Sequence, residues 1–121
     1  MMKQLGDITH INGSSIKPVN IITFGSPCTN ISQAGDKTGL SGTQSSLFFE
    51  AIRTIREMRK ATGGKYPRFI IFENVKAILT SNKGYDFARV LSEITETTIP
   101  VPKDGRWATC GMAELPGCNL A

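Results

Sequence analysis

Two short apolar runs with a helical pattern between them constrain the fold of this chain most. Residues Val19–Phe24 and Phe69–Phe72 are rich in β-branched and aromatic side chains and contain few polar ones. Runs of this length and composition are typical of strands that are buried on both faces of a parallel sheet. Between them, Ser45–Lys60 repeats apolar residues at helical spacing. This order of strand, helix and strand predicts a βαβ unit with a right-handed crossover.

The remaining segments complete an α/β fold class, with a parallel sheet and flanking helices. Residues 25–44 are rich in Gly, Ser, Thr and Asn, which predicts a long loop, and such loops usually have a function. A second amphipathic helix is expected over Tyr85–Thr97, before a Pro- and Gly-rich tail in which Trp107 is a candidate anchor. The apolar stripes of the two helices define the predicted core. Its members are Phe48, Ala51, Ile52, Ile55, Met58, Phe87, Val90, Leu91 and Ile94.

Length and composition indicate one globular domain. The chain has 121 residues, of which 40% are hydrophobic and 20% are charged, as in ordinary soluble proteins. It has neither an apolar run of membrane-spanning length nor a signal-peptide core in its first ten residues, so we expect a cytoplasmic protein without a membrane partner. The net charge of +4 favours nucleic acid as a partner. The densest basic residues, Arg53, Arg56, Arg59 and Lys60, are better explained by a solvated helix face.

The cysteines favour a reactive thiol over a disulfide or metal site. There are three, Cys28, Cys110 and Cys118, without C-x-x-C spacing, and the chain has a single histidine, His10. An odd number without a secretory signal argues against a disulfide framework, and structural zinc is disfavoured because it needs four ligands at close spacing, which these residues do not have. Cys28 follows the first strand in a Gly-Ser-Pro turn, where nearby backbone N–H groups would lower the pKa of its thiol. The alternative is a small buried hydrophobic residue, but Cys28 lies outside both apolar stripes.

A carboxylate and an amide follow the second strand. The carboxyl ends of parallel strands meet at one edge of the sheet, where ligands bind, so Glu73 and Cys28 are expected at the same edge. Half-burial at the strand end would raise the pKa of Glu73 and suit it to share a proton. The alternative role of Glu73 is an ion-pair partner or an acid at a helix start. Asn74 would orient Glu73 or cap the following turn.

Three motifs together resemble the DNA cytosine-5 methyltransferases, most closely the phage-type branch. The nucleophile loop and following helix of that family are similar to Gly25–Cys28 (GSPC) with Ser32, Ala34-Gly35, Gly39 and Leu47–Glu50 (LFFE). Glu73–Val75 is similar to its Glu-Asn-Val motif, and Gly6–Thr9 to its Gly-Asp-Ile motif. The motifs fall in the family's order and cover essentially the whole chain. The resemblance implies a partial Rossmann-like fold of the class I S-adenosylmethionine-dependent methyltransferases.

The resemblance also implies a reaction on double-stranded DNA. A target cytosine is flipped out of the duplex, Cys28 adds to carbon 6, and Glu73 holds a proton at ring nitrogen 3. Carbon 5 then takes a methyl group from S-adenosylmethionine, and loss of its proton expels the thiol. Asn74 would contact the base or brace the loop. The implied cofactor-binding residues are Asp7, Ile8, Pro27 and Leu47, and the implied DNA-binding residues are Ser32, Gly35 and Gly39. A plain turn residue at Asp7 and a core leucine at Leu47 are the simpler alternatives.

Departures from the family pattern limit what the chain is expected to do alone. Thr29 replaces the usual Gln after the nucleophile, and neither the Phe-x-Gly-x-Gly cofactor loop, the ribose-binding acid, the Gln-x-Arg-x-Arg motif nor a target-recognition region is found. We therefore expect residues 1–121 to be the central part of a catalytic domain, a truncated frame or one part of a split enzyme that needs a complementary subunit. The expected setting is the cytoplasm of a bacterial or phage-infected cell, in restriction-modification or anti-restriction.

Two other classes compete with this interpretation. One is a non-catalytic remnant that binds DNA or another methyltransferase subunit. The other is a thiol hydrolase that uses Cys28 and His10, which is disfavoured because it leaves Glu73 and Asn74 without a role and His10 without an orienting group.

Overall fold

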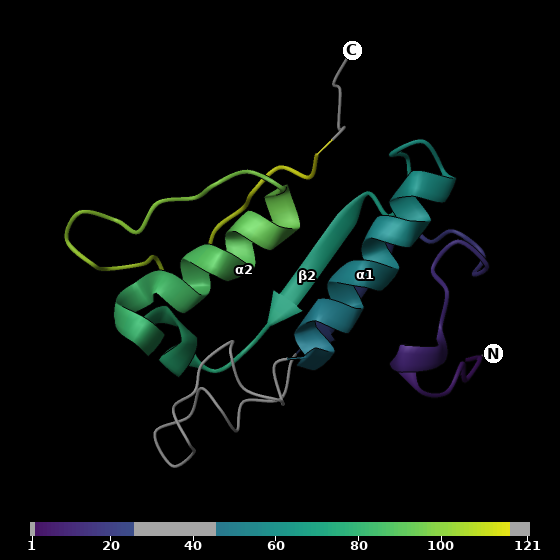
Figure 1. The fold of residues 1–121 in the computed structure, drawn as a ribbon, viewed down its shortest axis with the longest axis horizontal. Coiled ribbons are helices and arrows are strands. Elements are labelled where there is room, and N and C mark those ends of the chain that lie inside the picture. Colours follow the sequence, from purple (N-terminus) through teal and green to yellow (C-terminus); the bar gives the residue numbers. More distant parts are fainter. Residues whose placement is uncertain (1, 26–45, 117–121) are drawn as a thin grey trace.

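The computed structural model describes residues 2–25 and 46–116, and their order of elements is that of a βαβ unit followed by a helix (Figure 1). Strand β1 spans Ile21–Gly25, helix α1 Ser46–Ala61, strand β2 Phe69–Glu73 and helix α2 Tyr85–Thr95. Three short 3-10 turns accompany them: η1 (Ile8–His10), η4 (Lys76–Leu79) and η5 (Ser81–Gly84). The two strands pair in parallel, which confirms the predicted α/β class. The observed bounds of both strands and both helices lie within two residues of the predicted ones.

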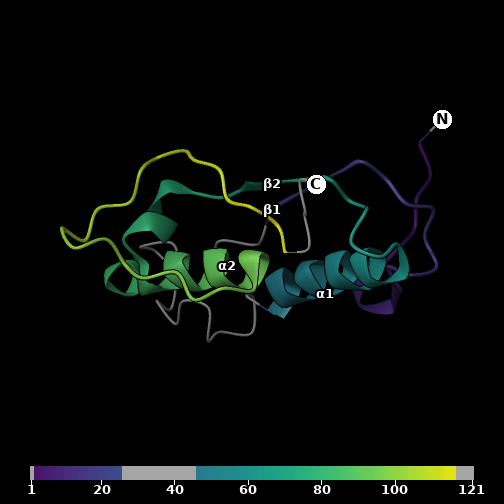
Figure 2. The same ribbon diagram turned by 90° about the horizontal axis from the view of Figure 1, so that it is seen from above.

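The sheet is covered on one face only within the described residues. Both helices lie on the same side of β1 and β2 (Figure 2). Side chains alternate along each strand, so Phe24 and Phe72 pack toward the helices. On the opposite face, Ile21, Phe69 and Ile71 are 51, 59 and 55% exposed. The prediction that both faces of the strands are buried is therefore wrong for this part of the chain, because no described element covers the second face.

Aromatic packing between the sheet and α1 forms the centre of the core. Phe48 is completely buried, and its ring centroid lies 6.2 Å from that of Phe24 and 5.7 Å from that of Phe72. Ile52, Val90 and Ile78 complete the buried cluster. The first two were predicted from their helical spacing. Ile78 was not, because it lies in the short turn η4, which lies outside the two apolar stripes of the predicted helices.

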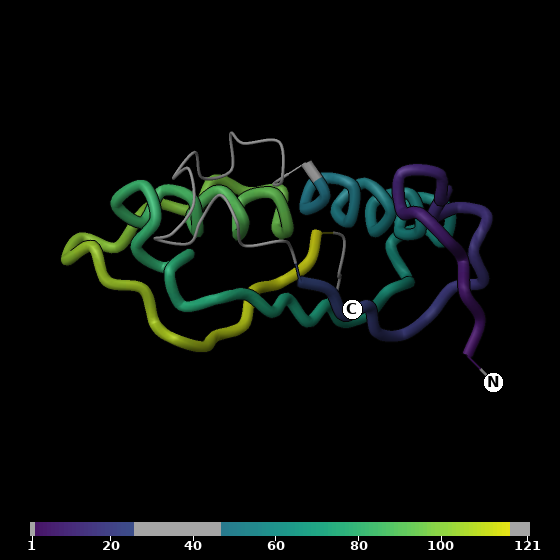
Figure 3. The backbone as a smooth tube through the Cα atoms, turned by 90° about the horizontal axis from the view of Figure 1, so that it is seen from below, coloured from purple at the N-terminus to yellow at the C-terminus, as the bar shows by residue number. Residues whose placement is uncertain are grey.

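The C-terminal tail is fastened at two points. Trp107 donates a hydrogen bond to the carbonyl of Gly84 at 2.9 Å and packs edge-on against Phe87, which confirms Trp107 as an anchor. Further along, the tail returns to the region where α1, α2 and β2 meet (Figure 3). There the buried guanidinium of Arg59 donates to the carbonyl of Pro116 at 2.6 Å, and Leu115 is buried.

The described helices can be compared with membrane-spanning helices in length and hydropathy. None of them combines the length and the apolar composition that a bilayer-spanning helix requires.

Candidate functional site

The carboxyl ends of β1 and β2 meet at Gly25 and Glu73, which are partners in the strand register. They approach so closely that a Cβ atom added to Gly25 would lie 2.9 Å from the carbonyl oxygen of Glu73 and 3.0 Å from its Oε2. The carboxylate of Glu73 therefore lies against the backbone at the end of β1. Cys28 follows Gly25 by three residues, and Cys28 itself lies outside the described residues.

Glu73 is exposed, so its predicted half-burial is wrong. Glu73 belongs to the face of β2 that also carries Phe69 and Ile71, and that is the face without a covering element among the described residues. A carboxylate in this position is accessible from outside the sheet edge.

Asn74 stabilises the backbone directly after the strand. Its side-chain carbonyl oxygen accepts a hydrogen bond from the N–H of Val75 at 2.7 Å, and Val75 precedes the turn η4. The turn η4 has no side-chain cap hydrogen bond, so this contact is not the predicted capping of the turn, and the predicted roles of Asn74 toward Glu73 and the base stay predictions.

Leu47 lies in the first turn of α1, at the same end of the sheet as Glu73, because α1 runs antiparallel to the two strands (Figure 1). Its side chain is 38% exposed, while the neighbouring Phe48 takes the core position. The alternative that Leu47 is a core leucine is therefore wrong. The other predicted site residues of this region lie outside the described residues; they are Pro27, Ser32, Gly35 and Gly39.

Asp7 caps the turn η1. Its Oδ1 accepts hydrogen bonds from the backbone N–H of Thr9 at 2.9 Å and from the Thr9 hydroxyl at 2.8 Å. These hydrogen bonds hold the pKa of Asp7 below its ordinary value of 3.8. Asp7 is exposed and Ile8 is partly buried, so the turn presents a charged and an apolar group side by side. His10 ends the same turn and is exposed.

The basic residues of α1 make contacts within the chain. Arg53 forms ion pairs with Glu50 at 2.7 Å and Glu57 at 2.6 Å. Arg53 also donates to the backbone carbonyls of Ile8 and Ile11, 45 and 42 residues away. Helical spacing carries no signal for these long-range contacts, so the sequence interpretation missed them.

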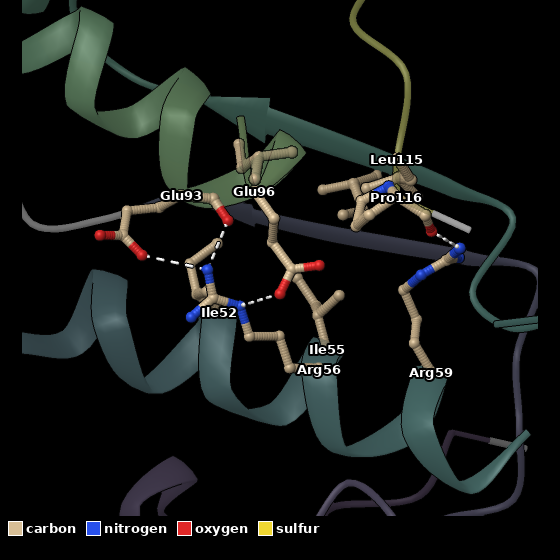
Figure 4. A pocket seen from close by; sticks show the side chains of 10 residues that line it. Ile52, Ile55, Arg56, Arg59, Glu93, Glu96, Leu115 and Pro116 are labelled. Atoms are coloured by element: carbon tan, nitrogen blue, oxygen red, sulfur yellow. Dashed lines mark hydrogen bonds and ion pairs between the residues drawn. The ribbon is translucent and has the colours of Figure 1, made fainter. Parts of the chain in front are cut away.

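A small pocket lies between α1, α2 and the tail, nearer to the start of β2 than to Glu73 (Figure 4). Arg56 crosses it to reach Glu93 at 3.1 Å and Glu96 at 3.5 Å, and Arg59 holds the tail beside it. Because Arg53, Arg56 and Arg59 bind partners inside the chain, their clustering is no evidence for a DNA-binding surface. The pocket lies where the two helices meet, and none of the predicted site residues line it.

Comparison with known proteins gives a consistent family. The family model for the C-5 cytosine-specific DNA methylases matches residues 2–98. The chain is 40% identical to the type II methyltransferase M1.ScrFI of Lactococcus lactis subsp. cremoris over 91 residues, which are 75% of this chain and 22% of that protein. It is 36% identical to the type II methyltransferase M.SsoII of Shigella sonnei over 96 residues, 79% of this chain and 24% of that protein.

A phage protein is similar over a comparable segment. The orphan methyltransferase M.SPRI of Bacillus phage SPR is 34% identical over 79 residues, 65% of this chain and 16% of that protein. The chain thus spans between a sixth and a quarter of the length of these three relatives.

Proposed function

The chain belongs to the C-5 cytosine-specific DNA methylases, and we propose that it supplies the catalytic edge of such an enzyme, with Cys28 as the nucleophile and Glu73 as the acid. The observation that supports this proposal is the register at the strand ends. Glu73 lies against Gly25, and only two residues separate Gly25 from Cys28. The proposal therefore has a single base bind beyond this edge, between Glu73 and the residues that follow Gly25.

The proposed reaction uses these two side chains in sequence. The Cys28 thiolate forms a bond to carbon 6 of a flipped cytosine while Glu73 gives a proton to ring nitrogen 3, so negative charge does not accumulate on the ring. S-adenosylmethionine would supply the methyl group as an electrophile: carbon 5 would bond to the methyl carbon as the bond from that carbon to the sulfonium breaks, and S-adenosylhomocysteine would leave. Water then takes the carbon 5 proton, the double bond between carbons 5 and 6 forms again as the bond from carbon 6 to Cys28 Sγ breaks, and the nitrogen 3 proton returns to Glu73. Because Glu73 is exposed, a base can reach it from solution, and in this proposal the bound base itself buries the carboxyl group and so favours its protonated form.

A methyl donor is implied by the family, and we propose that S-adenosylmethionine is bound through Asp7, Ile8, Pro27 and Leu47. Three of these lie in the described part of the chain. The exposed carboxylate of Asp7 can accept hydrogen bonds from an adenosine, and the partly exposed Ile8 and Leu47 offer apolar contacts to its base. Ser32, Gly35 and Gly39 are proposed to contact the phosphates of double-stranded DNA, as hydroxyls and close backbone approaches commonly do.

We further propose that residues 1–121 are the central part of a catalytic domain and act together with a complementary methylase part. Parallel sheets are normally covered on both faces, and an exposed apolar patch marks a contact surface. Here Ile21, Phe69 and Ile71 form such a patch over neighbouring register positions. The three relatives are several times longer than the matched segment, and we propose that elements of such additional length cover this patch. The competing function is a non-catalytic remnant that binds DNA or such a subunit.

Covalent trapping tests the catalytic proposal. Duplex DNA containing 5-fluorocytosine holds the enzyme as a denaturation-resistant adduct after methyl transfer, because fluorine cannot leave carbon 5 as a proton does. The chain is incubated with this DNA and S-adenosylmethionine, alone and with the flanking parts of the Lactococcus relative. We expect an adduct in the mixture, its loss in Cys28→Ser, a strong decrease in Glu73→Gln, and no change in the control Cys110→Ser, which alters an exposed free cysteine.

Each part of the proposal can be contradicted separately. An adduct that persists in Cys28→Ser, or no adduct in any mixture, would refute the catalytic role and favour the remnant. Robust methylation by the chain alone would refute the need for a complementary part.

A further inference from the structure

The N-terminal segment is held on α1 by the side chain of Arg53. Its two terminal nitrogens donate hydrogen bonds of 2.8 Å to the carbonyl oxygens of Ile8 and Ile11, the residues that begin and follow the turn η1. Figure 1 shows η1 beside α1, on the side away from α2. One planar guanidinium therefore binds both ends of a turn that lies more than 40 residues away in the sequence.

Two carboxylates fix the orientation of this guanidinium. Glu50 accepts from Nε of Arg53 at 2.7 Å, and Glu57 accepts from its Nη1 at 2.6 Å. Residues at these spacings lie on one face of a helix, so the two acids hold Arg53 from the turns before and after it. A charged group with four acceptors in different directions has little freedom to reorient.

A second contact attaches the same segment to α1. The backbone N–H of Gly13 donates to the Glu57 carboxylate at 3.1 Å. Gly13 packs so closely that a Cβ added there would lie 2.1 Å from the carbonyl oxygen of Thr54. The backbone at Gly13 thus packs directly against the backbone of α1, and the Glu57 carboxylate binds both Gly13 and Arg53.

We infer that Arg53 is a positioning residue, which sets the turn Asp7–Ile8 relative to Leu47 and thereby shapes the cofactor site. Leu47 and Arg53 lie on the same helix, six residues and roughly 9 Å apart along its axis. A rigid helix that carries Leu47 at its start and binds the Ile8 carbonyl through Arg53 fixes the separation of the two apolar groups. This inference rests on the proposed cofactor roles of Asp7, Ile8 and Leu47.

The test uses the full chain, labelled with nitrogen-15, and compares Arg53→Gln, Arg53→Lys and the control Arg56→Gln. Arg56 lies on the same helix but pairs with α2, so its loss leaves the N-terminal contacts intact. The first measurement is the backbone order parameter of residues 8–11. We expect about 0.85 in the unaltered chain and in Arg56→Gln, and below about 0.6 in Arg53→Gln. Arg53→Lys should recover only part of the order, because an ammonium cannot bridge two carbonyls and two carboxylates.

The second measurement is a titration of the labelled chain with S-adenosylmethionine in the presence of the flanking parts of the Lactococcus relative, followed at the amides of residues 7–9. We expect Arg53→Gln to weaken binding about tenfold or more and Arg56→Gln to change it less than about twofold. The thermal midpoint and the amide spectrum of α2 should stay unchanged in Arg53→Gln, which separates positioning from a general loss of structure. Unaltered order in residues 8–11, or unaltered binding despite lost order, would overturn the inference.

The outcome for the unaltered chain separates the inference from the function on which it rests. If S-adenosylmethionine shifts none of the amides of residues 7–9, the proposed cofactor roles fail, and the cofactor part of the inference fails with them. The order parameters decide independently whether Arg53 holds the turn.

Discussion

In the structure, Glu73 lies so close to Gly25 that the last residue of β1 has no room for a side chain. Replacing Gly25 by alanine tests this close approach. The new Cβ would lie 2.9 Å from the Glu73 carbonyl oxygen, which is closer than real Cβ contacts, and 3.0 Å from its Oε2, which is tighter than most. Crowding of this kind costs about 1–3 kcal/mol. An alanine elsewhere in a strand would gain roughly 0.5–1 kcal/mol over glycine. The free energy of unfolding should therefore fall by about 1 kcal/mol in Gly25→Ala, the difference of these two effects.

Urea denaturation followed by the fluorescence of Trp107 measures this loss. With a slope of about 1–3 kcal/mol per molar urea, the midpoint should fall by about 0.3–1 M. The matched control is Gly111→Ala, because a Cβ added at Gly111 meets nothing within 4 Å. Gly25→Ala should also slow formation of the 5-fluorocytosine adduct, since the carboxylate of Glu73 is displaced from the strand end.

A higher urea midpoint in Gly25→Ala would refute this reasoning. It would mean that alanine fits at the end of β1 as it fits in an ordinary strand. The close approach of Gly25 and Glu73, and with it the geometry proposed for the catalytic edge, would then be wrong.

The remaining predictions concern packing, the tail and pH. Phe48→Ala should lower the free energy of unfolding by about 3–5 kcal/mol, since Phe48 is fully buried, whereas Phe69→Ala, at a site 59% exposed, should cost at most about 2 kcal/mol in the same urea assay. Trp107→Phe loses one hydrogen bond and should cost about 0.5–1.5 kcal/mol, visible as a lower thermal midpoint by circular dichroism. The hydrogen bonds from Thr9 that lower the pKa of Asp7 stabilise η1 above pH 3.8, and this contribution is lost as the pH falls through the lowered pKa. The NMR shift of the Thr9 amide should follow this titration, and Asp7→Asn should abolish the titration.

Local patterns in the sequence predicted the elements well, because helices and strands depend on near neighbours. The apolar repeat around Phe48, Ile52 and Val90 identified members of the core correctly. The parallel order of the strands then implied that Glu73 and the end of β1 share one edge, and the register of Gly25 with Glu73 confirms it. The positions assigned to the Cys28 loop remain predictions.

The features that were mispredicted or missed depend on contacts between distant segments. A continuous apolar strand is typical of burial on both faces, but the described elements cover one face, which leaves Ile71 and Glu73 exposed. Ile78 joins the core from a short turn with no periodic pattern. Arg53 has the spacing of a solvated ion pair with Glu57, and no local signal indicates that it also binds η1.

The hydrogen bond between Arg59 and the tail affects the order in which the chain folds. The Arg59 guanidinium is buried and donates to the carbonyls of Pro67 and Pro116, at 2.6 Å each. The second acceptor lies 57 residues further along the chain, so this hydrogen bond forms only when the tail reaches α1. Contacts at such separation form late, because a long loop must close first. During synthesis, the βαβ unit can therefore assemble before the tail, and the hydrogen bond from Arg59 to Pro116 forms only afterwards.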